Sequence, residues 1–333
     1  MHVTNPEQIA AKLLTYLREE CSALPLDYAE PLTQLQGGQE TDTFRFALRG
    51  GQDQLPGALV LRLYPAHFGA HNAVWESTVQ RVLASTGYPV PNVYLTCTDL
   101  SILGGAFFVM ALLPGQPLMS APSATIPRRL GETHAALHAV DPAPLIKAFS
   151  EQGIPAAAYR LDRRLTQLRE RVTRFPWLQP AVDWLFAQRP DEPAELVICH
   201  GDFHPLNILV DGDRVTGVID WPGFLLADPA LDVATTLVLT TIPAKQLARQ
   251  MAGLADVDWD QVGQRYLEAY QAVRPLDTEK LAYYRVRRCV HALLEGAEGQ
   301  MVWRQPVVVN ELVAYIQGVT GVNIKVLSKQ GDK

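Results

Sequence analysis

The chain has 333 residues, enough for two compact units, and its 48% hydrophobic and 19% charged residues indicate a globular rather than a disordered protein. Its formal net charge of −6 provides no general basic surface for nucleic acid or for an anionic membrane. The four cysteines are widely spaced, which argues against a disulfide framework and against a zinc knuckle. No apolar run approaches the roughly 20 residues that span a membrane, which argues against a membrane protein. We therefore expect a soluble, cytoplasmic protein, with no obligatory protein partner indicated.

The first third of the chain predicts a helix followed by an antiparallel sheet. Asn5 and Pro6 have the pattern of a helix start, and apolar residues follow at helical spacing. Between residues 32 and 64 the apolar residues alternate with polar ones, as in strands, around a turn at Gly50 and Gly51. The remaining elements expected here are a helix around Val74 to Leu83 and two strands, Asn92 to Thr96 and Ala106 to Leu112.

Beyond Pro114 and Gly115 the pattern becomes mainly helical. One β hairpin is expected between Leu196 and Ile219, because Asp211, Gly212 and Asp213 form a turn signal between two apolar runs. The stretch from Asp141 to Ala158 is expected to be an irregular connection. The helices are expected at Ile126 to Val140, Leu161 to Val172, Gln179 to Ala187, Gln261 to Val273, Thr278 to Leu294 and Val307 to Gln317.

Three oxygen-bearing side chains flank the predicted hairpin, namely Asp202, Asn207 and Asp220. Phosphoryl transfer needs a carboxylate that orients the acceptor hydroxyl, together with hard oxygen ligands for Mg²⁺. Asp202 suits the first role, and Asn207 and Asp220 suit the second. The residue types in this segment therefore favour a phosphoryl-transfer site.

Two motifs resemble elements of the aminoglycoside phosphotransferase and choline kinase superfamily. The catalytic element is similar to H-G-D-x-x-x-x-N, which contains Asp202 and Asn207, and the metal-binding element is similar to I-D-W, which contains Asp220. This resemblance implies a two-lobed, protein-kinase-like α+β fold. It divides the chain into a nucleotide-binding lobe at 1–113 and a helical lobe at 114–333. It also implies Asp202 as the catalytic residue, ATP or GTP as the phosphate donor, and Mg²⁺ held by Asn207 and Asp220.

The resemblance extends to the first lobe. Gly37 and Gly38 are similar to the family's nucleotide loop, where glycines let backbone amides approach phosphate. Val60 and Arg62 alternate along a strand, so they share the face that would meet the nucleotide. Glu76 is expected at the start of a helix. In the family, an acidic residue at this place pairs with the basic residue of the strand, so the resemblance implies an ion pair of Glu76 with Arg62 that anchors phosphate.

Met110 to Leu113 resembles the hinge between the lobes, which implies that Met110 and Leu112 contact the nucleotide. Leu225 to Ala234 resembles the helix that follows the metal-binding aspartate. Protein kinases carry arginine where Gly201 stands, and only seven residues separate Asp220 from Asp228. Because no activation loop fits between them, the resemblance implies a small hydroxyl compound as acceptor rather than a protein.

Two other functions remain open. One is a nucleotide-binding regulatory protein of the same fold that has lost catalysis. The other is a metal hydrolase, because His200, Asp202 and His204 alternate and would share one face of a strand. His134 and His138 lie four residues apart, but without the glutamate of a zinc protease motif they are interpreted as partly buried helix residues.

Several acidic residues have structural explanations. Asp228 before Pro229 is typical of a helix start, and Asp232 in the same first turn is expected to support the catalytic hairpin. The acidic group at Asp256, Asp258 and Asp260 is interpreted as a helix cap, with a cation-binding site as the alternative. The sequence leaves the acceptor open among aminoglycosides, macrolides, choline, homoserine and sugars.

Overall fold

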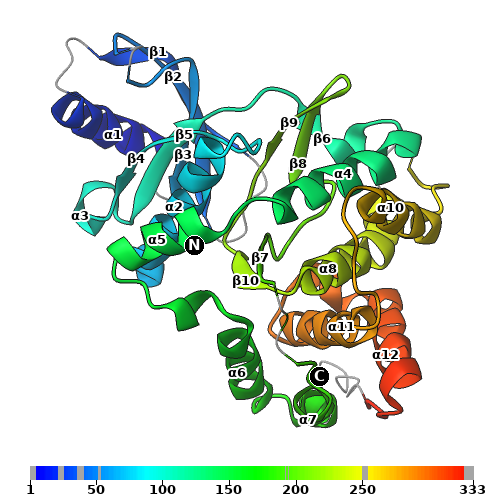
Figure 1. Cartoon of the computed structure of the whole chain (residues 1–333). Helices are drawn as coiled ribbons and strands as arrows, with labels where there is room; N and C mark the ends of the chain where they lie inside the picture. The colour runs from blue at the N-terminus through cyan, green and yellow to red at the C-terminus, as the bar shows by residue number, and fades with distance from the viewer. Residues whose placement is uncertain are drawn as a thin grey trace, which may run out of the picture. The chain divides into compact units, whose positions relative to one another are not determined.

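The computed structural model describes residues 5–21, 26–35, 41–51, 54–191, 193, 195–249 and 254–325. The chain divides into two compact units (Figure 1). The first unit comprises Met1–Gly115 together with Leu209–Pro222, and the second comprises Gln116–Ile208 together with Gly223–Lys333. An antiparallel sheet in the first unit and a mainly helical second unit confirm the predicted α+β, kinase-like fold.

The first unit is built on a five-stranded sheet in the order β1-β2-β3-β5-β4, in which every neighbouring pair is antiparallel. On β3 and β5, Val60 lies opposite Met110 and Arg62 lies opposite Phe108. The elements of this unit before residue 115 are α1 (Pro6–Glu20), β1 (Asp27–Gln34), β2 (Asp42–Arg49), β3 (Ala58–Leu63), α2 (His71–Ser85), β4 (Val93–Cys97), α3 (Leu100–Leu103) and β5 (Phe107–Ala111).

The two faces of this sheet bury different sets of side chains. On one face, Ile9, Leu13 and Leu17 of α1 pack against a cluster that includes Phe44 and Leu59. The other face carries a separate cluster of six buried residues, Val60, Tyr64, Ala73, Ala106, Phe108 and Met110, with Ala73 contributed by α2. Since alternate residues of a strand point to opposite faces, Arg62 shares the α2 face with Val60, as predicted.

A β hairpin from the middle of the sequence completes the first unit. It consists of β8 (Ile208–Asp211) and β9 (Arg214–Val218), and the predicted turn joins them. Thr216 Oγ1 donates to the carbonyl of Pro114 at 2.6 Å, and the amide of Val218 donates to the carbonyl of Pro89 at 2.8 Å. These bonds hold the strand that leads to Asp220 against the sheet-containing unit.

The second unit contains most of the helices. The first turn of α10 begins at an N-cap, Asp258, whose Oδ1 accepts from the amides of Asp260 and Gln261, and this confirms the cap interpretation. The elements of this unit are β6 (Gln116–Pro117), α4 (Ile126–His138), α5 (Ala143–Glu151), α6 (Leu161–Val172), α7 (Gln179–Ala187), β7 (Val197–Cys199), β10 (Leu225–Ala227), α8 (Pro229–Thr241), α9 (Pro243–Ala248), α10 (Trp259–Val273), α11 (Leu281–Ala297) and α12 (Pro306–Thr320).

Three local expectations were wrong. The stretch from Asp141 to Ala158 contains α5, because its prolines occupy the helix start, where a missing N–H is tolerated, and Leu145 and Phe149 bury one face. The segment Leu225–Ala227 is a strand paired with β7, so the following helix begins only at Pro229. Glu76 lies in the middle of α2 rather than at its start, since the helix already begins at His71.

Helix α4 packs closely on α10 within the second unit. A Cβ atom at Gly131 would lie 2.7 Å from Ala269 Cβ and 2.8 Å from the Tyr266 carbonyl oxygen, so the helix backbones approach where no side chain intervenes.

None of the helices in the described part of the chain has the length and apolar character that crossing a bilayer requires.

We expect Gly131→Ala to lower the free energy of unfolding by about 1–3 kcal/mol, because the added methyl group overpacks the crossing of α4 and α10. Urea denaturation followed by circular dichroism measures this change. Gly318→Ala on α12 is the matched control, since its Cβ would meet no atom within 4 Å. That variant should gain about 0.4–1 kcal/mol from the reduced entropy of the unfolded chain. Equal effects of the two substitutions would contradict the close packing.

Candidate active site

The loop after β7 carries the predicted catalytic residue. Its second residue, Gly201, has φ of 80°, and a Cβ there would lie 2.2 Å from the carbonyl oxygen of Gly223. A larger residue is excluded both by backbone conformation and by space. The tight turn at Gly201 brings the loop from the buried strand to Asp202, whose side chain is 41% exposed.

Asp202 is held by two other residues of its own loop. Asn207 Nδ2 donates to the Asp202 carbonyl oxygen at 3.0 Å and to its Oδ2 at 3.3 Å. His204 Nε2 lies 3.4 Å from the same carboxylate oxygen. The loop therefore brings Asp202, His204 and Asn207 together, and His204 contacts the carboxylate directly.

The charge of Asp202 is favoured by its surroundings. Desolvation raises the pKa of this carboxyl, but His204, His200 and Arg288 outweigh that effect and hold the pKa well below its usual range. The carboxylate is thus ionised at neutral pH. An ionised carboxylate can orient a hydroxyl group and accept its proton.

His200 is fully buried, and its Nδ1 accepts a hydrogen bond from the Asp202 amide at 3.2 Å. This hydrogen bond braces the loop next to Asp202. The alternative metal site of His200, Asp202 and His204 is not formed, because within the described ranges the residues whose ligand atoms cluster are His134, His138 and Asp232.

Asp232, in the first turn of α8, holds the start of the loop that carries Asp202. Its carboxylate is fully buried and accepts from the amide of His200 at 2.6 Å and from the amide of Gly201 at 2.9 Å. Desolvation raises the pKa of this group, but His134 and His138 lower it well below the usual value. The expected support for the catalytic hairpin is thus direct contact with the loop backbone.

Two histidines of α4 surround the same carboxylate. The Nε2 atoms of His134 and His138 lie 2.9 and 3.4 Å from Asp232 Oδ2. Their Nδ1 atoms lie 2.7 Å from the hydroxyl groups of Tyr266 and Tyr270, respectively. Both rings are fully rather than partly buried, contrary to expectation. Since every ring nitrogen already has a hydrogen-bonding partner, we interpret the cluster as a polar network and not as a metal site.

The first unit carries its own charged group. Arg62 Nε lies 3.1 Å from Glu76 Oε2, which confirms the predicted ion pair, and Arg62 Nη2 lies 2.6 Å from Asp220 Oδ1. Burial lowers the pKa of the Arg62 guanidinium, but Glu76 and Asp220 raise it above its usual value. Arg62 therefore remains charged and joins α2 to the segment that follows β9.

Glu76 is positioned by several donors. It is 1% exposed, its Oε2 accepts from the Tyr64 hydroxyl, and its Oε1 accepts from the amide of Trp221 at 3.3 Å. Neither Tyr64 nor Trp221 was predicted from the sequence to contact Glu76. A signal was present in Tyr64, which lies two residues after Arg62 and therefore on the same strand face.

The predicted metal ligands have oxygen atoms available. Asp220 is a non-glycine residue with φ of 70°, and its Oδ2 makes no hydrogen bond or ion pair with a described residue. Asn207 uses its amide nitrogen within the loop, and its Oδ1 is likewise unpaired among the described residues. Carboxylate and amide oxygens are the donors that Mg²⁺ prefers, so these residues fit the ion.

The apolar nucleotide contacts expected on β3 and β5 lie together. Val60 and Met110 belong to the buried cluster on the α2 face, and Leu112 packs against it. The amide of Leu112 donates to the carbonyl of Ala58 at 2.9 Å, which continues the sheet pairing one residue beyond the end of β5. Gly37 and Gly38 lie outside the described residues.

The contacts around Asp232 could not be predicted from the sequence either. His134 and His138 are four residues apart on α4, and Tyr266 and Tyr270 are four apart on α10. Two polar pairs with the same helical spacing were the available signal. It could not be used from the sequence, because nothing there shows that α4 packs on α10.

Comparison with known proteins identifies the family. A family profile described as the phosphotransferase enzyme family matches residues 31–304. Acyl-CoA dehydrogenase family member 11 of Gallus gallus is 29% identical over 236 residues, which are 64% of this chain and 29% of that protein. The aminoglycoside 3'-phosphotransferase of Streptomyces fradiae is 37% identical over 99 residues, 28% of this chain and 32% of that protein. The chain thus spans under a third of these curated relatives.

Solved structures share the fold. A thermostable mutant of the aminoglycoside phosphotransferase APH(4)-Ia, in a ternary complex with AMP-PNP and hygromycin B, has a TM-score of 0.59 at 20% identity and covers 93% of this chain and 98% of its own. The macrolide 2'-phosphotransferase of Brachybacterium faecium has a TM-score of 0.54 at 20% identity, with 91% and 97% covered. At this identity the likeness concerns the fold alone.

We expect Asp232→Asn to lower the free energy of unfolding by about 3–5 kcal/mol at pH 7, because it removes an acceptor of buried hydrogen bonds and turns amide hydrogens toward backbone N–H groups. Urea unfolding measures the loss. Asp260→Asn is the matched control, since its side chain is 71% exposed and a surface ion pair contributes at most about 1 kcal/mol. A comparable loss in the control would contradict the role of Asp232.

The burial of His134 predicts a pH dependence of stability. Desolvation, and then the neighbouring His138, lower the pKa of His134 to about 4, against about 6.5 in the unfolded chain. As the pH falls, the unfolded chain binds the proton first, so stability is complete above pH 6.5 and declines toward pH 4. Between pH 7 and pH 5 this residue should account for a loss of about 2 kcal/mol.

Urea midpoints of the native protein and of His134→Gln at pH 7, 6 and 5 measure this contribution. The variant should be less stable at pH 7 but should lose less stability on acidification. Parallel declines in the two proteins would show that His134 is not held neutral by burial.

Proposed function

Because the chain belongs to the phosphotransferase enzyme family, we propose that it is a small-molecule kinase that transfers the γ-phosphate of ATP or GTP to a hydroxyl group. The observation that supports this most directly is the buried ion pair of Arg62 and Glu76, which extends to the carboxylate of Asp220. A charge pair of this kind on a strand and a helix serves to hold nucleotide phosphates in kinase-like folds.

The donor side is assigned to residues of the first unit. Arg62, fixed by Glu76, would contact the phosphates, and the apolar residues Val60, Met110 and Leu112 would contact the base. The proposal includes Gly37 and Gly38 as the phosphate loop. Mg²⁺, held through Asn207 and Asp220, would neutralise the charge of the phosphates.

The acceptor side is assigned to the catalytic loop. The ionised carboxylate of Asp202 would accept a hydrogen bond from the acceptor hydroxyl and align its oxygen. That oxygen forms a bond to the γ-phosphorus as the bond between this phosphorus and the bridging oxygen breaks. The nucleoside diphosphate leaves, and Asp202 takes the hydroxyl proton.

A catalytically silent nucleotide-binding protein is the alternative. It would retain the Arg62–Glu76 pair but would have no need of an ionised carboxylate at Asp202. The bonds from Asn207 Nδ2 to the backbone and carboxylate of Asp202 favour the enzyme, because they keep the side chain in one orientation.

The relatives named for acyl-CoA dehydrogenases favour a specific candidate acceptor. This chain corresponds to between 25% and 30% of their length. Because this chain matches one part of proteins that are named for acyl-CoA, a hydroxyl-bearing acyl-CoA is a candidate phosphate acceptor. Aminoglycosides and macrolides remain the candidates suggested by the structural neighbours.

We expect Asp202→Asn to reduce phosphate transfer by about 10²- to 10⁴-fold, since it removes the proton acceptor while preserving the shape of the side chain. Transfer of labelled γ-phosphate is measured with Mg²⁺ and a panel of hydroxyacyl-CoA thioesters, aminoglycosides and macrolides. Nucleotide hydrolysis without acceptor is measured in parallel. Asp183→Asn, an exposed position on α7, serves as the control and should retain full activity.

The same proteins are compared by thermal melting with and without Mg²⁺ and nucleotide. A ligand that binds the native state raises the melting temperature, and this rise should persist in Asp202→Asn. Equal transfer activity in the native protein and Asp202→Asn would refute the assignment of Asp202. A nucleotide-induced rise without any transfer by the native protein would favour the silent alternative.

A further inference from the structure

A row of basic side chains lies where α6 meets α11 in the second unit. We call Arg164, Arg171, Arg287, Arg288 and His291 the basic row. Arg171 Nη1 lies 3.2 Å from His291 Nε2, which places the facing sides of the two helices in contact. Arg164 lies two turns before Arg171 on α6, and Arg287 lies about one turn before His291 on α11.

Carboxylates compensate only part of this row. Arg171 forms an ion pair with Glu298, and Arg288 Nη1 lies 2.9 Å from Glu295 Oε2. Both glutamates are at the C-terminal end of α11 or just beyond it. The compensated charges therefore lie toward one end of the row, and Arg164 and Arg287 lie toward the other.

Arg164 and Arg287 have no carboxylate partner among the residues that the structure describes. Arg164 Nη2 donates to the carbonyl of Phe224 at 3.4 Å, and the Nε atom of Arg287 is buried without a hydrogen bond. Burial, Arg164 and Arg288 lower the pKa of Arg287 to about 10. The unpaired end of the basic row thus has a surplus of positive charge in a partly desolvated position.

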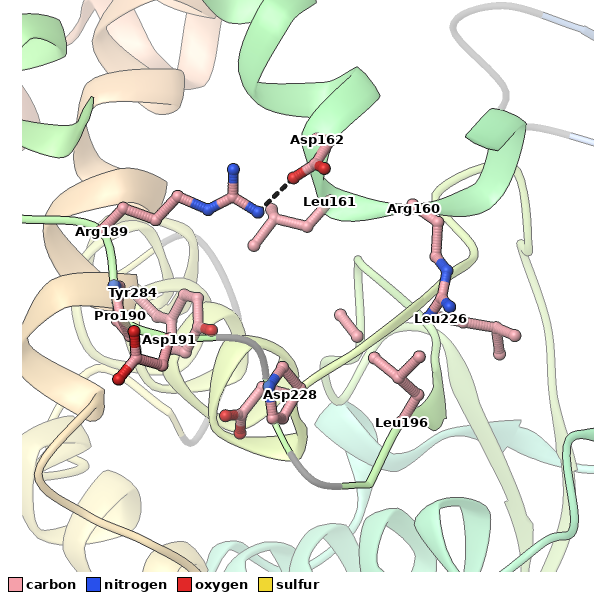
Figure 2. Close-up of a pocket in the computed structure, with 12 residues that line it drawn as sticks. Arg160, Leu161, Asp162, Arg189, Pro190, Asp191, Leu196, Leu226, Asp228 and Tyr284 are labelled. Carbon is pink, nitrogen blue, oxygen red and sulfur yellow. Dashed lines mark hydrogen bonds and ion pairs between the residues drawn. The ribbon is translucent and has the colours of Figure 1, made fainter. Parts of the chain in front are cut away.

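A pocket opens at the same end of α6 and α11. Its lining includes Arg160 and Leu161 at the start of α6 and Tyr284, which lies one turn before Arg287 on α11 (Figure 2). In Figure 2 Arg189 reaches toward Asp162, and the dashed line marks their ion pair, whereas Arg160 lies apart from both beside Leu226.

The acidic residues of this pocket do not neutralise the surplus. Asp162 is taken by Arg189, and Asp228 Oδ2 lies 3.0 Å from Lys280 Nζ. The backbone of Arg160 forms a β-bridge with Leu226, but its side chain makes no hydrogen bond or ion pair with any residue in the described ranges. The remaining lining carboxylate, Asp191, is exposed to solvent.

An unpaired buried charge lowers stability, whereas a charge-assisted hydrogen bond to an anion recovers that loss. We propose that Arg160, Arg164 and Arg287 bind an anionic group of the phosphate acceptor, a carboxylate or a phosphate. The identification of the ligand as the phosphate acceptor rests on the proposed kinase function. The anion site itself does not depend on that function. It predicts an acidic substrate in place of a polycationic aminoglycoside.

The position of the basic row relative to the catalytic loop agrees with this assignment. Arg288 belongs to the row, and its positive charge lowers the pKa of Asp202. An acceptor whose anionic end is held by Arg164 and Arg287 would therefore lie in the same unit as the carboxylate that receives its hydroxyl proton.

Anion binding is tested first without any acceptor. Isothermal titration measures the affinity of the native protein, Arg287→Gln, Arg287→Lys and Arg163→Gln for sodium phosphate and for sodium malate, at constant ionic strength and with saturating Mg²⁺ and AMP-PNP. Arg163 is the matched control, because it is an exposed arginine next to Arg164 on α6.

We expect Arg287→Gln to weaken binding of the preferred anion by about 10- to 100-fold, since it removes a charged hydrogen-bond donor. Arg287→Lys should retain part of the affinity, and Arg163→Gln should retain nearly all of it. Without the anion, Arg287→Gln should melt at least as high as the native protein, because it removes an unpaired charge. Stronger binding of phosphate than malate, or the reverse, identifies the anionic group.

Equal affinities in the native protein, Arg287→Gln and Arg163→Gln would overturn the proposal. So would an acceptor whose KM is unchanged in Arg287→Gln. An acceptor KM raised about 10-fold or more, with little change in kcat, would support it. Loss of anion binding in Arg287→Gln, together with no phosphate transfer by the native protein, would refute the kinase function while leaving the anion site intact.

Discussion

The carboxylate of Asp232 is the group on which the loop that carries Asp202 depends. Its Oδ1 accepts from the amide of Gly201 and its Oδ2 from the amide of His200, and two histidines of α4 also approach Oδ2. Its burial would be unfavourable without these donors. The loop that presents Asp202 is therefore held through its backbone, so its position depends on the packing of α4, α8 and α10 rather than on the exposed residues of the loop.

A second buried carboxylate has the corresponding role in the first unit. Glu76 holds Arg62 from α2, and the Trp221 amide donates to it, so the strand and the segment after β9 converge on one side chain. Removing either member of such a pair leaves a buried charge unpaired. Each unit thus contains one carboxylate that fixes the functional groups around it. In contrast, Arg164 and Arg287 are basic groups that the described residues leave without a carboxylate, and this surplus suits an external anion.

Much of the architecture could be predicted from the sequence, because its causes are local. The alternation of apolar residues predicted β2 and β3, helical spacing predicted α6 and α7 with the bounds that the structure has, and the Asp211 to Asp213 turn predicted the hairpin. Local composition was misleading at α5, where prolines suggested an irregular connection although they occupy its first turn. The order of short polar motifs along the chain was sufficient to predict the family, because phosphoryl transfer restricts which residue types can stand at those positions.

The sequence by itself determined the fold class, the hairpin and the residue types of the candidate site. It could also predict the pairing of Arg62 with Glu76, because their roles follow from the family pattern. Only the tertiary structure brought His134 and His138 to Asp232, since residues about 100 positions apart meet only after α4 packs on α10 and α8. The basic row was likewise decided by packing, because an arginine in the sequence does not reveal whether a carboxylate will lie beside it in the folded chain.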